Sequence, residues 1–164
     1  MAKPTRVDVS IAEGLERSGL PRRADFNRWV AAALEQAKAR GVVSLRVAGD
    51  AEMQELNERY RGKRKPTNVL SFAADRDLPA AVGALLGDVV VCAPVVATEA
   101  RAQHKRVHDH YAHLCIHGVL HLLGYDHEND ADAVAMEAVE KAALARLGIA
   151  DPYRPMIDHD DDDR

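Results

Sequence analysis

The sequence predicts a single α/β (α+β) domain, built as one small sheet with helices packed on it. The chain has 164 residues, a length that suits one domain with a substantial core. Short stretches of strand-like alternation are separated by longer stretches of helical periodicity, and no repeat or linker divides them. The expected element order, β-α-β-α-β-β-α-α-α, fits helices lying on one sheet. We therefore expect residues 1–157 to fold as one unit.

The first half of the chain alternates strands and helices. Residues 6–11 (RVDVSI) alternate polar and apolar side chains, which predicts a half-buried strand. Between Pro21 and Gly41 apolar residues recur at helical spacing, and glycine is common just past a helix end. Residues 42–48 predict a second strand. Asp50 follows as the expected N-cap of a short helix, because its carboxylate can accept from the first amides of a helix.

The second half begins with strands and ends with helices. Two short strands are expected, at residues 68–72 and 88–92, with an irregular stretch between them. Helical periodicity then extends over residues 94–123, with a break expected near residues 108–110. Gly124 is placed to end this helix, since glycine adopts the left-handed conformation without a steric penalty. A last helix is expected at about residues 132–147.

Charge and cysteine content narrow the class of protein. The formal net charge is −4, and residues 158–164 (DHDDDDR) carry −4 by themselves, so the rest of the chain is neutral. We expect this acidic tail to stay solvated and disordered. No apolar run is long enough to span a membrane, and the N-terminus lacks the apolar centre of a signal peptide. Two cysteines give no disulfide framework, so we expect a cytoplasmic protein.

The most specific motif is HGVLHLLGYDH at residues 117–127. Its pattern, H-x-x-x-H-x-x-G-x-x-H, has the zinc-ligand spacing of the metzincin proteases. On a helix, His117 and His121 lie one turn apart on the same face, and Gly124 can reverse the chain so that His127 joins them. Three protein ligands leave one coordination position open, as in catalytic zinc sites. Imidazole suits zinc first, although nickel, copper and iron also accept it.

The residue after the first histidine separates this motif from that of a protease. Metzincins carry a Glu there as general base, whereas this chain has Gly118. Neutral imidazoles leave the full charge on the metal, which can lower the pKa of a bound water to about 7 and attracts anions. A phosphodiester is anionic and a peptide carbonyl is not, so the motif favours phosphate-ester hydrolysis. Asp126 could assist as a base or orient His127, and we expect the orienting role.

Other residues near the motif have plainer interpretations. His113, one turn before the motif, could support the site, contact the substrate or be a bystander, and we favour a supporting or bystander position over a metal ligand. His104, His108 and His110 are expected on the solvent side of a helix pair. Cys115 is expected to be a small core residue, because it lies on the opposite side of the helix from the histidines.

A basic loop precedes the third strand. It contains, among residues 59–65, Arg59, Tyr60, Arg61, Lys63, Arg64 and Lys65. A basic loop is often a solvated turn, but beside a metal site it can follow a phosphate backbone. We therefore take Arg59, Arg61 and Lys63 as candidate substrate-binding residues. Aromatic residues are few, so we expect no platform for stacked bases.

Three segments together are similar to one known family. They are YRGKRKPTNVLSF at residues 60–72, GDVVVC at residues 87–92 and HGVLHLLGYDH at residues 117–127. In this order and combination they resemble the YbeY family of bacterial endoribonucleases, also called rRNA maturation factors. The resemblance covers most of the chain and leaves out the acidic tail.

The resemblance implies a fold, a site and an activity. The implied fold is one domain with a mixed four-stranded sheet and about five helices. The implied site is one Zn²⁺ ion bound by His117, His121 and His127, with Arg61 as the family's catalytic arginine. The implied activity is hydrolytic cleavage of single-stranded RNA. The implied role is maturation of the 3′ end of small-subunit (16S) ribosomal RNA, together with ribosome quality control in the cytoplasm.

Two other functions stay open on the residues alone. One is a metalloprotease-like zinc hydrolase without the usual Glu base, in which Met136 or Met156 would stand for the Met-turn. The other is a non-catalytic, ribosome-binding protein with a structural zinc. Gly118 counts against the first, and the open coordination position counts against the second.

Overall fold

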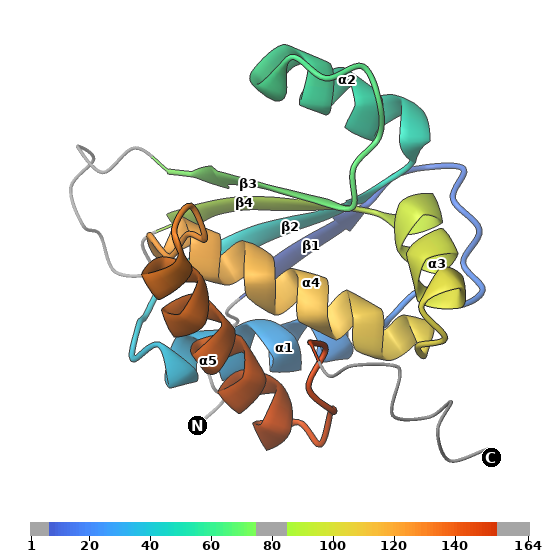
Figure 1. Cartoon of the computed structure of the whole chain (residues 1–164). Coiled ribbons are helices and arrows are strands. Elements are labelled where there is room, and N and C mark those ends of the chain that lie inside the picture. The colour runs from blue at the N-terminus through green and yellow to red at the C-terminus, as the bar shows by residue number, and fades with distance from the viewer. Residues whose placement is uncertain (1–6, 75–84, 154–164) are drawn as a thin grey trace, which may run out of the picture.

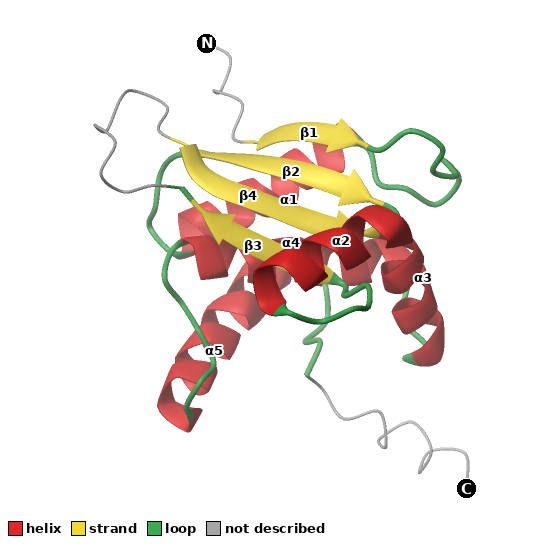
Figure 2. Cartoon of the chain, turned by 90° about the horizontal axis from the view of Figure 1, so that it is seen from above, coloured by secondary structure: helices red, strands yellow, loops and turns green. Residues whose placement is uncertain are grey.

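The sheet has four strands in a mixed arrangement. The computed structural model describes residues 7–74 and 85–153. Its strands are β1 (Val7–Ile11), β2 (Val42–Ala48), β3 (Val69–Ala73) and β4 (Leu85–Cys92), in the spatial order β1-β2-β4-β3 (Figure 2). β1, β2 and β4 are parallel, and β3 pairs antiparallel with β4. β3 is therefore an edge strand, with its outer backbone groups free of the ladder.

The helices cover the two faces of the sheet unequally. α1 (Arg23–Gln36), α4 (Val107–Leu122) and α5 (Asp130–Arg146) lie on one side, and α2 (Asp50–Arg61) lies on the other (Figure 1). α3 (Ala93–Ala102) follows β4 directly and packs on α4. Because α4 contacts β3, β4, α1, α3 and α5, it occupies the centre of the domain.

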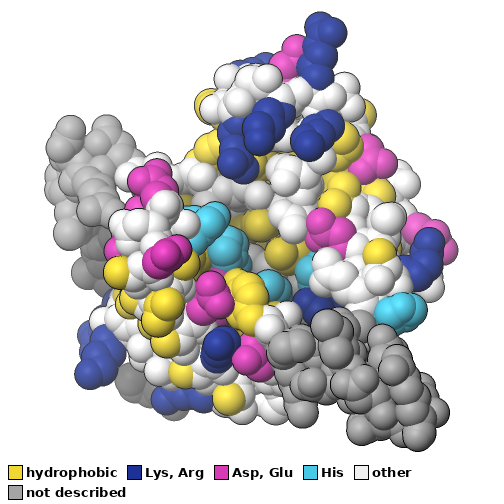
Figure 3. All heavy atoms as spheres, in the orientation of Figure 1, with side chains coloured by type: hydrophobic (Ala, Val, Ile, Leu, Met, Phe, Trp, Pro, Cys, Tyr) yellow, Lys and Arg dark blue, Asp and Glu magenta, His cyan; other side chains and the backbone are white. Residues whose placement is uncertain are grey.

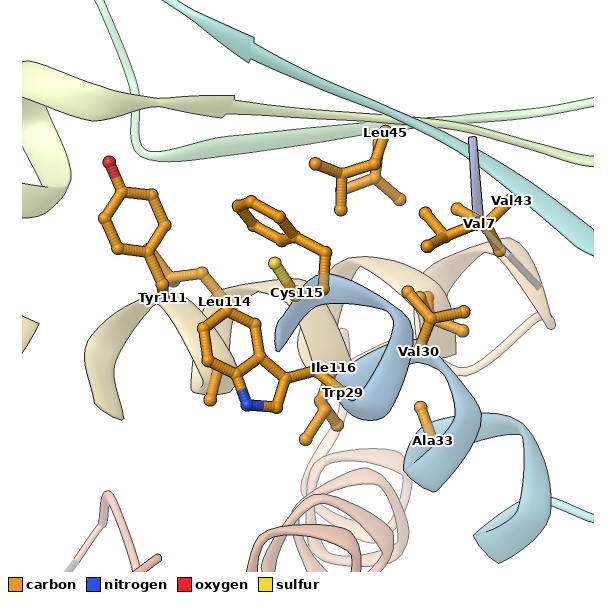
Figure 4. Close-up of a cluster of buried hydrophobic side chains, with 14 of the residues drawn as sticks. Val7, Trp29, Val30, Ala33, Val43, Leu45, Tyr111, Leu114, Cys115 and Ile116 are labelled. Atoms are coloured by element: carbon orange, nitrogen blue, oxygen red, sulfur yellow. The ribbon is translucent and has the colours of Figure 1, made fainter. Parts of the chain in front are cut away.

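A separate apolar core lies on each face of the sheet. In the larger core, Phe26 makes edge-to-face contacts with Trp29 and Tyr111, with ring centroids 5.4 and 6.2 Å apart. Trp29 on α1 and Tyr111 and Cys115 on α4 pack beneath Leu45 of β2, between the helices and the sheet (Figure 4). The smaller core fills the space between α2 and the opposite face; its buried members are Ala48, Met53, Leu70, Val90 and Cys92. The second half of β4, residues 89–92, is buried on both faces, which accounts for its apolar run VVVC.

The predicted element order and fold class are confirmed, but several helix ends differ. α1 ends at Gln36, ahead of Gly41, and Lys38 follows with a positive φ of 57°. The break between α3 and α4 lies at residues 103–106, where His104 has a φ of 55°, rather than at residues 108–110. In both places a non-glycine residue makes the left-handed turn, which sequence patterns do not reveal.

Element starts also differ from the prediction. The N-cap of α2 is Gly49, and Asp50 is its first helical residue, so the predicted cap is wrong by one position. β4 begins at Leu85, because its first residues pair with the start of β2. α5 begins at Asp130, because the Asn129 side chain accepts from the Asp132 amide at 2.9 Å.

His110 is buried, so the prediction that it faces solvent is wrong. Its exposed fraction is 3%, and its Nε2 lies 2.9 Å from a carboxylate oxygen of Glu99 on α3. Asn68, just before β3, donates to the same carboxylate at 3.1 Å. Burial lowers the pKa of His110, and the hydrogen bond with Glu99 opposes this shift. His104 is exposed as predicted, and His108 is half-buried.

Both cysteines are free and buried, and Cys115 has the predicted core position. No helix among the described residues is long and apolar enough to cross a membrane. The acidic tail expected at residues 158–164 lies outside the described part of the chain.

Candidate metal centre and cleft

α4 carries the first two histidines of the motif on one face. His117 and His121 are half-buried, and their ring centroids are 4.6 Å apart. Their neighbours Ile116 and Leu120 are fully buried in the core. The buried neighbours fix the rotation of the helix about its axis, so both imidazoles stay at the surface of the core.

The turn after α4 adds the third histidine. Gly124 has a φ of 98°, a left-handed conformation that glycine adopts readily. The amides of Gly124 and Tyr125 donate to carbonyls in the last turn of α4, at 3.1 and 3.0 Å. The chain therefore reverses, and the His127 ring lies 5.6 Å from that of His117 and 5.3 Å from that of His121.

The ring nitrogens of these three histidines converge. One nitrogen from each lies within 4.8 Å of the others, and the Nε2 atoms of His117 and His121 are 3.0 Å apart. The pKa of His121 is lowered by burial and by the charges of His117 and His127. His121 is therefore neutral at pH 7 and keeps a lone pair for a metal. The three histidines of the motif are thus brought together in one place.

Glu140 on α5 holds His117 in position, and the sequence interpretation missed it. The Glu140 side chain is fully buried, and His117 donates to its Oε1 through Nδ1. The Tyr153 hydroxyl donates to Oε2 at 2.5 Å. Burial would raise the pKa of Glu140, but hydrogen bonds from His113, His117 and Tyr153 outweigh it and hold the pKa at about 2. Glu140 is therefore a carboxylate at neutral pH, and it leaves Nε2 of His117 free to bind a metal.

The sequence did contain a signal for Glu140. The buried residues of α5 are Met136, Glu140, Ala143 and Leu144. Their spacing is that of one helical face, so Glu140 is the single acidic residue on the apolar face of this helix. Acidic residues are almost never fully buried unless they are paired. A glutamate at a core position of the helix after the histidine motif therefore indicates a buried partner.

Two other polar residues lie around the histidines. His113 forms, with His117 and Glu140, a second group of possible metal ligands, but hydrogen bonds already occupy that carboxylate. His113 lies with its Nε2 3.3 Å from the Tyr153 hydroxyl, the supporting position expected for it. Asp126 accepts from the Glu128 amide at 3.2 Å, and among the described residues no hydrogen bond joins it to a histidine.

Gly118 has a steric role in addition to the absence of a Glu base noted from the sequence. A Cβ at this position would lie 2.8 Å from the Val89 side chain and 3.1 Å from the Ser71 hydroxyl. Ser71 donates to the Gly118 carbonyl at 2.9 Å. Gly118 therefore lets β3 and β4 approach α4 closely, and a carboxylate at this position would strike the sheet before it reached a metal.

The histidines form the floor of a cleft of about 780 Å³. One wall is the whole of β3 with the two residues before it, residues 67–73. Tyr60 and Arg61, at the end of α2, and Tyr153, after α5, also line the cleft. The space-filling view shows the hollow with histidines inside it and Lys and Arg side chains gathered over α2 above it (Figure 3).

The three basic candidates differ in their relation to the cleft. Arg61 is exposed, lines the cleft and has no ion-pair partner among the described residues. Arg59 donates to Glu55 at 3.0 Å across one turn of α2. Lys63 is exposed beyond the end of α2. Neither Arg59 nor Lys63 is among the described residues that line the cleft.

Comparison with solved structures gives the fold independently. A protein from Thermotoga maritima, solved in solution, is similar with a TM-score of 0.54. The match covers 91% of this chain and 99% of the other, at 21% sequence identity.

Comparison with known sequences gives the family. The family model described as Endoribonuclease YbeY matches residues 17–148. A protein named Endoribonuclease YbeY from Stenotrophomonas maltophilia (strain R551-3) is 55% identical over 92% of this chain and 95% of its own. Proteins of the same name from Xanthomonas campestris (strain B100) and Laribacter hongkongensis are 52% and 51% identical, each over 92% of this chain and over 95% and 91% of their own. The chain belongs to the YbeY endoribonuclease family.

Proposed function

We propose that this chain is a metal-dependent endoribonuclease that hydrolyses single-stranded RNA. The metal, Zn²⁺ by preference, would be bound by His117, His121 and His127, and Arg61 would bind the substrate phosphate. The observation that carries the proposal is the convergence of three imidazole nitrogens within 4.8 Å at the floor of a cleft, in a chain whose relatives are named endoribonucleases.

The donor set suits a divalent metal. The hydrogen bond to Glu140 commits Nδ1 of His117, so Nε2 carries the lone pair that faces His121. The Nε2 atoms of His117 and His121 lie 3.0 Å apart, so without a cation one imidazole can donate to the other, whereas a bound metal would take the lone pairs of both. A bound Zn²⁺ would supply a Lewis acid and lower the pKa of water at its open position. Three neutral ligands would leave its positive charge uncompensated, which favours an anionic substrate.

The chain's own residues would position the RNA. Arg61 is exposed, free of a described ion pair and on the wall of the same cleft as the histidines. A guanidinium can donate to two phosphate oxygens at once, so Arg61 would hold the scissile phosphate as its negative charge grows. Arg59, engaged with Glu55, and Lys63 would contribute long-range attraction rather than contacts at the reacting phosphate.

We further propose that the substrate is ribosomal RNA. In this view the chain contacts the small ribosomal subunit, matures the 3′ end of 16S rRNA and takes part in ribosome quality control in the cytoplasm. Its support is the family to which the chain belongs.

The activity can be tested with zinc-loaded and metal-free protein. Each is mixed with an end-labelled single-stranded RNA, a fully paired duplex or an unfolded polypeptide. We expect zinc-dependent cleavage of the single strand only. His121→Ala, prepared in the same way, is the control for a contaminating nuclease, because it removes a proposed ligand and leaves the basic residues at and beyond the end of α2 unchanged. Cleavage that persists in His121→Ala, or cleavage of the polypeptide alone, would contradict the proposal.

A further inference from the structure

The aromatic residues of this chain are divided between the core and the cleft. The chain has two Phe, one Trp and four Tyr. Phe26, Trp29 and Tyr111 form the buried aromatic cluster, and Tyr125 is half-buried against the core. The remaining three, Tyr60, Phe72 and Tyr153, all line the cleft above the histidines. The expectation that so few aromatics exclude a stacking platform is therefore not supported by their placement.

Tyr60 is exposed and packs against Phe72. It lies in the last turn of α2, directly before Arg61, and 58% of it is exposed. Its ring centroid is 4.9 Å from that of Phe72 on β3, with the planes tilted by 57°. The contact with Phe72 restricts the tyrosine ring, and the exposed part of the residue contributes to the cleft lining. A ring held in this way loses little conformational entropy when a flat partner binds.

Tyr153 is held differently on the other side of the cleft. Its hydroxyl donates to the buried Glu140 carboxylate at 2.5 Å, and its amide donates to Asp151 at 2.8 Å. Its ring meets the edge of His113 with centroids 5.4 Å apart, and 40% of the residue is exposed. Tyr60 and Tyr153 come from α2 and from the segment after α5, which lie on opposite sides of the sheet (Figure 1).

We propose that Tyr60, backed by Phe72, and Tyr153 stack unpaired nucleobases on either side of the metal centre. This inference rests on the proposed function, and it names what the cleft selects in the RNA. Stacking needs a base whose face is free, and in a duplex both faces are covered by neighbouring pairs. The two tyrosines would therefore select single strands, and every base would be accepted because every base has an aromatic face.

The position of Arg61 supports this arrangement. Arg61 follows Tyr60 and lines the same cleft. The end of α2 thus contributes both an aromatic ring and a cation to one cleft, which are the two features that single-strand-binding grooves combine.

A double-mutant cycle between protein and RNA would test the inference. The RNA is a short single strand in which one base at a time is replaced by an abasic ribose. The measurement is single-turnover cleavage by zinc-loaded protein, which yields the protein concentration at half-maximal rate and the maximal rate. We expect Tyr60→Ala to raise the half-maximal concentration about 5- to 150-fold on intact RNA, the range for loss of one stacked base. On RNA that lacks the base stacked on Tyr60, the same substitution should leave the half-maximal concentration almost unchanged.

Matched variants separate stacking from other effects. Tyr60→Phe keeps the ring and should recover most of what Tyr60→Ala loses on intact RNA. Tyr153→Ala and Tyr153→Phe both lose the hydroxyl, so the difference between them isolates the ring. Val134→Ala removes an exposed apolar side chain that is outside the described cleft lining and should change nothing. Zinc content is measured in every variant.

The outcomes are distinguishable. If the parent cleaves RNA but Tyr60→Ala and Tyr153→Ala lose the same factor on intact and abasic strands at every position, the stacking inference is wrong and the proposed function stands. If the zinc-loaded parent leaves RNA uncut, the proposed function fails and this inference fails with it.

Discussion

Glu140→Gln is the sharpest test of how the metal centre is held. Glutamine keeps the size of the side chain but removes its charge and turns one acceptor oxygen into an NH₂ donor. His117 donates to one carboxylate oxygen, and Tyr153 donates to the other. An amide can accept only one of these two hydrogen bonds. If its NH₂ faces His117, the ring must accept at Nδ1 and carry its proton on Nε2, where the metal would bind.

The expected cost follows from this loss. Removing the partner of a metal-binding histidine typically lowers metal affinity 10- to 100-fold, about 1.4–2.8 kcal/mol. The assay is competition for Zn²⁺ with a coloured chelator at pH 7.5, with thermal unfolding followed in parallel. Glu16→Gln is the control, because Glu16 is exposed and far along the chain from the motif. A Glu140→Gln variant that binds zinc as tightly as the parent would refute the supporting role of Glu140.

The same pair of proteins gives a pH test without metal. The pKa of Glu140 in the folded state is about 2, below its ordinary value of 4.5, so its charge stabilises the fold above pH 4.5. That contribution is lost as the pH falls from about 4.5 to about 2. The difference in unfolding free energy between the parent and Glu140→Gln should therefore shrink as the pH falls from about 4.5 to about 2. A difference that grows on acidification would mean that burial, not hydrogen bonding, dominates at this carboxyl.

Three further predictions concern other parts of the site. His121→Ala should lose most bound zinc yet keep its circular dichroism spectrum, and full zinc occupancy in the variant would exclude this ligand. In the parent, zinc affinity should fall below about pH 6.5, because protons compete with the metal for imidazole. Arg61→Ala should slow single-turnover cleavage about 10²- to 10³-fold at unchanged zinc content, and Arg61→Lys should also be impaired. Lys63→Ala should mainly weaken RNA binding and reduce its salt dependence. If Arg61→Ala cleaves at the parental rate at saturating RNA, Arg61 is a surface charge only. Gly118→Ala should lower the free energy of unfolding by about 1–3 kcal/mol in urea, because the added Cβ meets Val89 at 2.8 Å; an unchanged midpoint would show that the sheet adjusts freely.

The parts of the fold that follow from local pattern were predictable from the sequence. The strands and helices have clear periodicity, and two histidines four residues apart share a helix face wherever the helix forms. Gly124 was predictable for the same reason, since the left-handed turn is a property of one residue. The boundaries at Lys38 and His104 were not, because non-glycine residues take positive φ there.

The parts that depend on contacts between distant segments were not predicted. Glu140 is 23 positions from His117, and Tyr153 is 13 positions beyond Glu140. No helical or strand period links residues so far apart. The steric role of Gly118 was missed for a related reason, because its neighbours Val89 and Ser71 lie on strands of the sheet, far from it in the sequence. Counting aromatic residues likewise said nothing about how many would face one cleft.

These distant contacts connect the two functions assigned to the cleft. Glu140 accepts from His117 through one oxygen and from Tyr153 through the other. The carboxylate that holds a candidate metal ligand therefore also holds the hydroxyl of a tyrosine in the proposed RNA-binding cleft. Because Glu140 is fully buried and its pKa is about 2, it stays charged and in place over the whole neutral range. A base resting on Tyr153 would thus be positioned relative to the metal through a single rigid side chain, so that substrate and metal keep the same spacing in every catalytic cycle.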